Sequence, residues 1–514
     1  MKNKLALLSV SDKTGLVDFA RGLVGQGFAI ISTGGTKKTL QEAGLPVKSV
    51  SELTGFPEIL DGRVKTLHPL VHGGILARRD LEEHQREMAE HGIGTIDLVA
   101  VNLYPFAQTV AKPTVTLEEA IENIDIGGPT MVRSAAKNYR HVAVVVNPTR
   151  YQAILAEMEQ SGALSEATRF ALAVEAFTHT AEYDANISGW LYRRLPGASL
   201  FSETLVLPYT LAQSLRYGEN PQQQAAFYHE SFPQSGSIAA ARQLHGRELS
   251  FNNLNDLNAA WEIVQEFAEP VAVAVKHANP CGVAVGKDLS EAYLRAFDAD
   301  PVSIFGGIVA VNRVLDARTA EKMSEIFLEV VMAPAYEEAA LAILTRKKDL
   351  RLLQAPLVPG TRTSLDYKKV SGGLLVQESD SEPVNSSGWG MVTNAKPDAK
   401  MLADMIFAMK VVKHVKSNAI VLVKDGQTIG IGAGQMNRVG AARIAIAQAG
   451  EKARGSILGS DAFFPFRDTV DEAAKAGVAG IVQPGGSLKD QESTEVANEY
   501  GMTMVMTGRR FFKH

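Results

Sequence analysis

Residues 5–15 read Leu5-Ala6-Leu7-Leu8-Ser9-Val10-Ser11-Asp12-Lys13-Thr14-Gly15, an apolar run that ends in a polar loop. Residues 28–36 repeat the arrangement as Phe28-Ala29-Ile30-Ile31-Ser32-Thr33-Gly34-Gly35-Thr36. We expect strands at 5–10, 28–32, 98–102 and 142–146, and helices at 15–24, 36–43, 116–124 and 130–138. Such alternation predicts an α/β fold with an open, largely parallel sheet and helices on both faces.

A change of pattern marks a domain boundary near residues 198–212. A helical stretch over 151–195 ends at Pro196-Gly197, and the alternation seen earlier stops there. A chain of 514 residues is also too long for one core and should form roughly three or four folding units. We therefore expect an N-terminal domain over 1–200 and a second region over 201–514.

The second region contains a weak internal repeat. Apolar residues at helical spacing over 254–267 precede a strand at 271–275 and then Lys276-His277-Ala278-Asn279. A similar helix over 401–412 precedes Lys416-Ser417-Asn418 and a strand at 419–423. The match is imperfect, because the lysine follows the strand in one copy and precedes it in the other. The pattern predicts two related α/β subdomains, about 201–375 and 376–514, joined by a polar loop over 379–396.

Composition excludes several classes of protein. The chain is 46% hydrophobic and 21% charged, and its net charge of −5 gives no electrostatic reason to expect nucleic acid as a partner, although a local basic pocket for a phosphorylated small molecule is compatible with it. No apolar run is long enough for a membrane span, and the one at the N-terminus is too short for a signal peptide. Cys281 is the single cysteine, which fits a reducing cytoplasm.

Two loops of the first domain have the features of a phosphate site. Each lies where a strand gives way to a helix, and helix N-termini attract anions through free backbone N–H groups. If the two strands are neighbours, the loops meet at one sheet edge. Turns and helix caps that bind nothing are the alternative. The candidate residues are Ser11, Lys13, Thr33, Gly34, Gly35 and Thr36.

Three further segments of the first domain carry reactive side chains. In Arg63-Val64-Lys65-Thr66-Leu67-His68-Pro69, the guanidinium can grip phosphate and Lys65 can act as a point charge. Tyr104 follows a buried strand, and Asp125 precedes a helix that carries Lys137. Together these groups can stabilise an oxyanion and move protons. A solvated loop, a packing tyrosine and a helix-capping aspartate are the alternatives.

In the second region, Lys276 and His277 directly follow an apolar strand, and Asn279-Pro280-Cys281-Gly282 is expected to turn the chain away. The imidazole can accept or donate a proton near neutral pH, and the lysine can stabilise a developing negative oxygen, which suits acyl chemistry. A histidine with a purely structural role is the alternative.

Three other segments of this region have an unusual composition. They are the polar loop 216–221, the segment 460–468 with three phenylalanines around a proline, and the basic tail 509–514 after an apolar strand at 502–506. Core packing of the aromatic rings and a frayed tail are the alternatives. A zinc deaminase site is not expected, because Pro280-Cys281 lacks the second cysteine of that motif.

Taken together, these motifs resemble the bifunctional phosphoribosylaminoimidazolecarboxamide (AICAR) formyltransferase/IMP cyclohydrolase family. The resemblance runs from the Ser9–Gly15 segment to Phe512-Lys513-His514, and it includes Phe177-Thr178-His179-Thr180-Ala181 and Asp461 to Asp468. It implies a methylglyoxal-synthase-like cyclohydrolase domain, followed by a transformylase of two cytidine-deaminase-like subdomains without zinc. It also implies a homodimer whose transformylase sites form across the subunit interface.

The resemblance further implies roles for individual residues. Nucleotide in the first domain would be held by Ser11, Lys13, Thr33, Gly34, Gly35, Thr36, Arg63 and Thr66, and Lys65, Tyr104, Asp125 and Lys137 would serve ring closure. In the second region, formyl transfer from 10-formyltetrahydrofolate would use Lys276, His277 and Asn418, with the nucleotide held by Arg216, Tyr217, Phe463, Arg510 and Phe512. No catalytic metal is expected.

The chain departs from animal members of the family at two places. Glu329 stands where they often carry an aspartate, and the chain lacks their long insertion near 452–456. Two other functions remain as alternatives: a sugar-phosphate lyase joined to an inactive module, and a nucleotide sensor. Neither alternative needs the acyl-transfer residues Lys276, His277 and Asn418.

Overall fold

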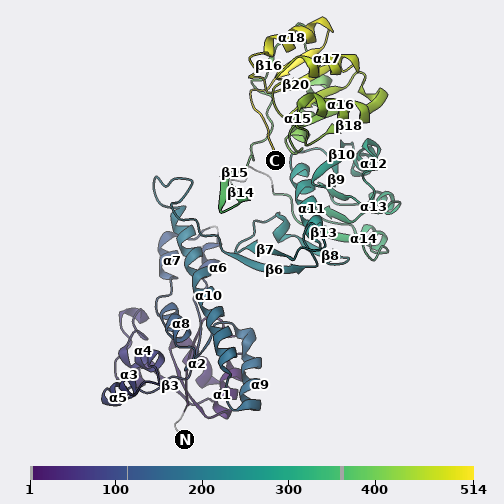
Figure 1. Ribbon diagram of the computed structural model, residues 1–514. Helices are drawn as coiled ribbons and strands as arrows, with labels where there is room; N and C mark the ends of the chain where they lie inside the picture. Colours follow the sequence, from purple (N-terminus) through teal and green to yellow (C-terminus); the bar gives the residue numbers. More distant parts are fainter. Residues whose placement is uncertain (1–3, 113, 359–363) are drawn as a thin grey trace. The chain divides into compact units, whose positions relative to one another are not determined.

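The computed structural model describes residues 4–112, 114–358 and 364–514. The chain divides into two compact units (Figure 1). One comprises Met1–Thr210 with Glu230–Phe232, and the other comprises Leu211–His229 with Pro233–His514.

The N-terminal unit contains a parallel five-stranded sheet in the order β3-β2-β1-β4-β5. The predicted parallel sheet is confirmed, and two predicted strands coincide with β2 and β4 residue for residue. The strands are β1 (Lys4–Val10), β2 (Phe28–Ser32), β3 (Val47–Ser49), β4 (Leu98–Asn102) and β5 (Ala143–Val145). Of these five strands, only β3, which is three residues long, was not predicted.

Ten helices are described around this sheet. They are α1 (Leu16–Gly25), α2 (Gly34–Glu42), α3 (Val50–Thr54), α4 (Pro69–Leu76), α5 (Glu82–Glu90), α6 (Phe106–Val110), α7 (Leu117–Glu122), α8 (Gly127–Lys137), α9 (Tyr151–Ser161) and α10 (Glu166–Tyr192). The predicted helical stretch over 151–195 forms two helices that are separated at 162–165. Gly162 ends α9 in the left-handed region at φ 74°, and Ser165 caps α10 by accepting a hydrogen bond from the N–H of Thr168 at 3.1 Å.

The C-terminal unit contains a twelve-stranded sheet in the order β16-β21-β20-β19-β17-β18-β10-β9-β11-β12-β13-β8. The sheet consists of two halves of six strands each, which join where β10 pairs with β18. Counted inward from the two ends of the sheet, corresponding pairs of neighbouring strands have the same direction, parallel or antiparallel, in both halves. The predicted internal repeat is confirmed. The first half is β8 (Arg242–His245), β9 (Val271–Lys276), β10 (Asn279–Val285), β11 (Ile308–Val311), β12 (Val330–Ala333) and β13 (Arg351–Gln354), and the second is β16 (Gly390–Met391), β17 (Ile420–Lys424), β18 (Gln427–Gly432), β19 (Ile457–Ser460), β20 (Gly480–Gln483) and β21 (Thr503–Met506).

The matched sheet order corrects the alignment of the two copies. Lys276 ends β9, and its counterpart at the end of β17 is Lys424, not Lys416. The segment Asn279–Gly282 is also not a turn, because it begins β10. The ladder tolerates the proline through a register shift between Pro280 and Gly282.

Helices cover both faces of this sheet. On one face, α11 (Phe251–Val264) and α15 (Ala399–Val412) share a single hydrophobic core with alternate residues of the central strands. The other face has a separate core for each repeat. Its helices are α12 (Leu289–Ala299), α13 (Ala317–Ser324) and α14 (Glu338–Leu344) in the first repeat, and α16 (Arg438–Ala449), α17 (Asp468–Lys475) and α18 (Asp490–Glu499) in the second.

Two hairpins lie outside the large sheets. They are β6 (Tyr209–Leu215) with β7 (Ala225–Glu230), and β14 (Leu365–Val370) with β15 (Gly373–Glu378). The predicted loop over 379–396 contains only the two-residue strand β16. Among the described residues, no helix is both long and apolar enough to cross a membrane.

Candidate active sites

The two predicted phosphate loops lie side by side in the N-terminal unit. They follow β1 and β2, which are neighbouring parallel strands. The hydroxyls of Ser9 and Thr33 share a hydrogen bond of 2.9 Å, and the Oγ1 of Thr36 accepts from the N–H of Val10 at 3.0 Å. The expected meeting of the loops at one sheet edge is therefore confirmed.

The geometry indicates which groups of these loops can receive an anion. Helix α2 begins at Gly34, so the first N–H groups of the helix point out of this edge. The ammonium of Lys13 lies close by, 3.9 Å from where a Cβ on Gly35 would stand. The hydroxyl of Thr36 also donates to the Val10 carbonyl at 3.0 Å, so it is committed to the fold.

A second cluster centres on Asp125, at the start of α8. Its Oδ1 accepts from the N–H of Gly128 at 2.8 Å. Burial raises the pKa of Asp125 above its ordinary value, although the N–H groups of Gly128 and Tyr104 and the charge of Lys65 act in the opposite direction. The structure thus brings Lys65, Tyr104 and Asp125 together, and a carboxyl with a raised pKa suits proton transfer.

Two glycines allow the start of α8 to lie close to Thr66 and to the Asp125 carboxylate. A Cβ on Gly127 would stand 2.7 Å from the Oγ1 of Thr66, which is buried. A Cβ on Gly128 would collide with the Oδ2 of Asp125 and stand 2.8 Å from Leu103. Helix α8 begins at Gly127, three residues before the predicted start, and both glycines belong to its first turn.

Other predicted residues of this unit lie apart from the cluster or have partners of their own. Lys137 is in the last turn of α8, about 15 Å along the axis from the first turn, so its part in ring closure stays a prediction. Arg63 forms an ion pair with Glu122 of α7, and the ammonium of Lys65 lies 3.4 Å from a carboxylate oxygen of Glu58.

In the C-terminal unit, Lys276 and His277 lie at the end of β9. The ammonium of Lys276 donates to the carbonyl of Phe305 at 3.0 Å. Glu329 is at the same sheet edge, because it precedes β12, and its carboxylate pairs with Arg351 at 2.7 Å. The longer side chain in place of the family's aspartate therefore has a cationic partner here.

Asn418 belongs to a network at the start of β17. Its Oδ1 accepts from Arg438 at 2.7 Å, and its amide donates to the carbonyl of Gln435 at 2.8 Å. Arg438 also forms a buried ion pair with Asp461, whose other oxygen accepts from the hydroxyl of Ser417 at 2.6 Å. Buried charges persist when paired and hydrogen-bonded in this way, and the network fixes the Asn418 amide.

The basic tail packs against this network and is not frayed. Phe511 is buried, and its N–H donates to the carbonyl of Asp461 at 2.8 Å. The N–H of Lys513 donates to the Ser417 hydroxyl at 3.0 Å. Arg510 lies 4.9 Å from the ring of Phe512, and this ring and that of Phe463 stay partly exposed. The structure thus gathers Asn418, Phe463 and the tail residues in one region.

Asn279 links this region to His277. Its Oδ1 accepts from the N–H of Lys416 at 3.0 Å, and its Nδ2 donates to the carbonyl of His277 at 3.1 Å. The catalytic candidates of the two repeats therefore meet where the repeats join. In the loop at 216–221, Arg216 lies 5.7 Å from the ring of Tyr217, and Asn252 of α11 donates to the carbonyl of Glu219 at 3.3 Å.

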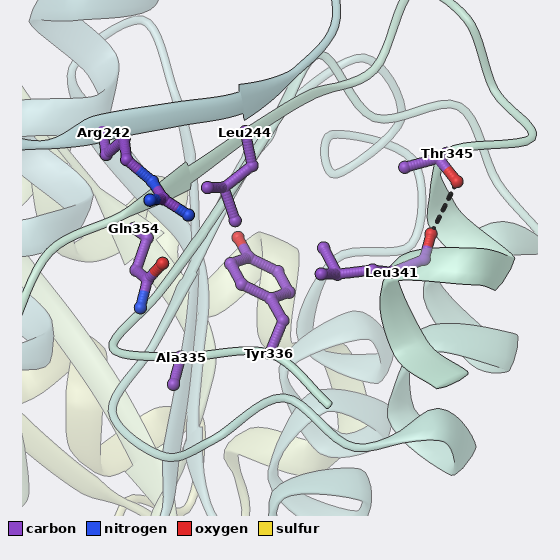
Figure 2. A pocket seen from close by; sticks show the side chains of 7 residues that line it. All are labelled: Arg242, Leu244, Ala335, Tyr336, Leu341, Thr345 and Gln354. Atoms are coloured by element: carbon purple, nitrogen blue, oxygen red, sulfur yellow. Dashed lines mark hydrogen bonds between the residues drawn. The ribbon is translucent and has the colours of Figure 1, made fainter. Parts of the chain in front are cut away.

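An open cavity of about 410 Å³ lies elsewhere in the first repeat (Figure 2). Its lining residues come from β8, the ends of β12 and β13, and α14: Arg242, Leu244, Ala335, Tyr336, Leu341, Thr345 and Gln354. Because β9 runs antiparallel to β11, the carboxyl ends of β12 and β13 lie at the edge opposite Lys276. This cavity is therefore not part of the site described above.

Comparison with known proteins gives the family. A model described as "AICARFT/IMPCHase bienzyme" matches residues 135–448, and one described as "MGS-like domain" matches residues 15–130. The "Bifunctional purine biosynthesis protein PurH" of Bacillus cereus (strain ATCC 10987 / NRS 248) is 58% identical over 511 residues, with 99% of this chain and 100% of the relative covered. The protein of the same name from Bacillus mycoides (strain KBAB4) has the same identity and coverage.

The chain belongs to the family of AICARFT/IMPCHase bienzymes. This confirms the predicted family, the enzyme class and the methylglyoxal-synthase-like N-terminal domain. A solved structure titled "Crystal structure of ForH" is 42% identical in sequence, and the match covers 37% of this chain and 100% of that chain. The TM-score of this match is 0.33, which is too low for a comparison of the folds. Among the described residues, no group of three or more His, Cys, Asp or Glu side chains could hold a metal ion.

Sequence reasoning missed several residues that support these sites. Tyr183 of α10 accepts at its hydroxyl from the N–H of Asp125 at 2.8 Å, yet it lies far along the chain from Asp125. Arg438 and Asp461 were missed as a pair because only the fold brings them together. The internal repeat could have pointed to Asp256, because Asp256 in α11 and Asp404 in α15 occupy equivalent positions in their helices.

Proposed function

We propose that the two units divide the activities of the bienzyme, with IMP cyclohydrolase over residues 1–200 and AICAR transformylase over 201–514. The chain catalyses the last two steps of IMP synthesis, as a transferase and a hydrolase. The observation that carries the division is the pair of separate polar clusters, one around Asp125 in the N-terminal unit and one around His277 and Asn418 in the other. The subdomains of the transformylase region are about 201–375 and 376–514.

In ring closure, the carboxamide nitrogen of the formylated nucleotide attacks the formyl carbon, and water leaves. The phosphate is held by the N–H groups at the start of α2 and by Lys13. Lys65 and Tyr104 stabilise the oxygen that develops negative charge, and Asp125 moves the proton. The raised pKa of Asp125, caused mainly by burial, supports this assignment because it brings the carboxyl nearer to neutral pH.

In formyl transfer, the 5-amino group of AICAR attacks the formyl carbon of 10-formyltetrahydrofolate, and tetrahydrofolate leaves. His277 accepts the amine proton, Lys276 stabilises the tetrahedral oxygen, and Asn418 orients the formyl group. The chain of contacts from His277 through Asn279 to Lys416 supports this grouping. Phe463, Arg510 and Phe512 hold the nucleotide, together with Arg216 and Tyr217.

The remaining assignments concern the state of the protein in the cell. The substrates are small molecules, the folate acts as a co-substrate, and no catalytic metal takes part. We place the enzyme in the cytoplasm as a homodimer whose transformylase sites form across the subunit interface. Sedimentation equilibrium should give twice the 55.3 kDa mass of one chain.

A coupled assay tests the proposed function. The protein is mixed with AICAR and 10-formyltetrahydrofolate, and both tetrahydrofolate release and the absorbance of IMP are followed. Release of tetrahydrofolate followed by IMP formation is expected. If the protein is silent in this assay but turns over dihydroxyacetone phosphate, the sugar-phosphate lyase is correct instead.

A further inference from the structure

The two repeats of the C-terminal unit carry the same turn in the same place. His277 and Ala278 connect β9 to β10 at φ 55° and 57°, and Asp425 and Gly426 connect β17 to β18 at φ 56° and 68°. All four residues therefore have left-handed backbone conformations, as in the two-residue turns that suit twisted hairpins.

Each turn is held by an aspartate from the helix that covers it. Asp256 of α11 accepts from the N–H groups of His277 at 3.1 Å and Ala278 at 2.7 Å, one on each carboxylate oxygen. Asp404 of α15 accepts in the same way from Asp425 at 2.9 Å and Gly426 at 2.7 Å. The same supporting contact is therefore present in both repeats.

The two turns differ in how well their residues tolerate the left-handed backbone conformation. Asp-Gly is a preferred pair for such turns, whereas most residues with an ordinary Cβ are strained in the left-handed region. The repeat with His277 and Ala278 carries the unfavourable pair. Unfavourable local conformations persist where the surroundings hold them, and they cluster at functional sites.

We propose that Asp256 is the positioning residue for His277 in formyl transfer. This rests on the proposed role of His277 as the group that accepts the amine proton. Asp256 fixes the N–H side of the turn, and Asn279 holds the carbonyl of His277 at 3.1 Å. The backbone of His277 is therefore held from both sides, which fixes the origin of its side chain relative to the bound amine.

Asp404 provides a matched control within the same chain. Both substitutions are made in the full-length enzyme. In Asp256→Asn and in Asp404→Asn, one carboxylate oxygen becomes an amide NH₂, so one of the two backbone N–H groups of the turn loses its acceptor. Asp256→Asn should lower kcat for formyl transfer by about 10- to 100-fold while KM for AICAR changes little, because misplacing a catalytic group slows chemistry without removing binding contacts. Asp404→Asn should leave kcat within about 2-fold, because its turn carries no residue of the reaction.

A rescue variant separates positioning from general loss of structure. Ala278→Gly relieves one left-handed residue, so adding it to Asp256→Asn should recover part of the lost kcat and should restore folding if the single variant unfolds. Cyclisation of preformed formylated nucleotide should stay intact in every variant. Equal loss of formyl transfer in the two Asn variants, unchanged kcat in Asp256→Asn, or no rescue by glycine would overturn the proposal. Absence of formyl transfer in the unmodified enzyme would instead overturn the proposed function.

Discussion

Asp125 combines a half-buried carboxyl with a cationic neighbour. Burial raises its pKa, and the opposing N–H groups and Lys65 do not cancel that effect. The backbone N–H groups that face the carboxyl come from Gly128, in the first turn of α8, and from Tyr104, in the loop after β4. Individual residues of the N-terminal site are therefore tuned by the fold around them.

The raised pKa predicts a specific pH dependence. The acid limb of the rate of ring closure should lie above pH 4, since an ordinary aspartate titrates near about 3.9. Because the pKa of Asp125 is higher in the folded state than in the unfolded state, its carboxyl contributes fully to the free energy of unfolding only below the unfolded-state pKa. This contribution is lost as pH rises through the folded-state pKa. Asp125→Asn should therefore remove the limb and most of the activity while raising the Tm at pH 7. An unchanged limb in the variant would assign it to another group.

Tyr183 predicts a second effect at one residue. Tyr183→Phe leaves the N–H of Asp125 and the carbonyl of Asn123 without their hydroxyl partner. Loss of such buried partners should lower the free energy of unfolding by about 1–3 kcal/mol, measured by urea denaturation, and should slow cyclisation. Tyr192→Phe on the same helix removes only an exposed hydrogen bond to Ser199 and serves as the control. Equal effects of the two variants would contradict the supporting role of Tyr183.

The element that shapes the proposed cyclohydrolase site is the first turn of α8. Two consecutive glycines let this turn contact Thr66 on one side and the carboxylate of Asp125 on the other. Gly128→Ala should displace that carboxylate and lower the rate of cyclisation by about 100-fold, since an error of about 1 Å at a reacting group can cost that much. Formyl transfer should be unaffected.

Gly25→Ala provides the control for this substitution. Gly25 is also in a helix of the N-terminal unit, and nothing lies within 4 Å of the Cβ that an alanine would add. Both activities and the Tm should stay close to those of the unmodified enzyme. Comparable loss of cyclisation in the two variants would mean that any added methyl disturbs the unit.

The sequence alone predicted well the strands that consist of apolar runs, and it predicted poorly a strand that contains turn-like residues. The apolar runs at 28–32 and 98–102 coincide with strands because buried parallel strands consist almost wholly of apolar residues. Strand β10 was missed because Pro280 and Gly282 resemble turn residues, and its register shift depends on a partner strand that sequence does not reveal. The alignment of the repeats failed for the same reason, since Lys424 is recognisable as the counterpart of Lys276 only in the sheet.

Candidate site residues followed a similar rule. Polar residues directly after a buried strand, such as Lys276, could be found because strand ends carry side chains to a sheet edge. Residues that reach a site from a distant helix, such as Tyr183 and Arg438, could not. Their roles depend on packing between elements far apart in the chain.

At the scale of the whole molecule, the two units have separate cores. Among the described residues, the buried members of the N-terminal cluster end at Trp190, and those of the clusters in the other unit begin at Leu249. Damage confined to one site should therefore leave the other site folded. This expectation allows the two activities to be separated in one polypeptide.

Reciprocal substitutions test that separation. His277→Ala should abolish formyl transfer and leave cyclisation of preformed formylated nucleotide intact, because it removes the proton acceptor of one reaction only. Lys65→Ala should do the converse, because it removes a charge beside the half-buried carboxyl of Asp125. Each activity is measured with its own substrate on one preparation, and a mixture of the two variants should restore IMP formation from AICAR through the released intermediate. Equal loss of both activities in either variant would show that the assignment of the units is wrong.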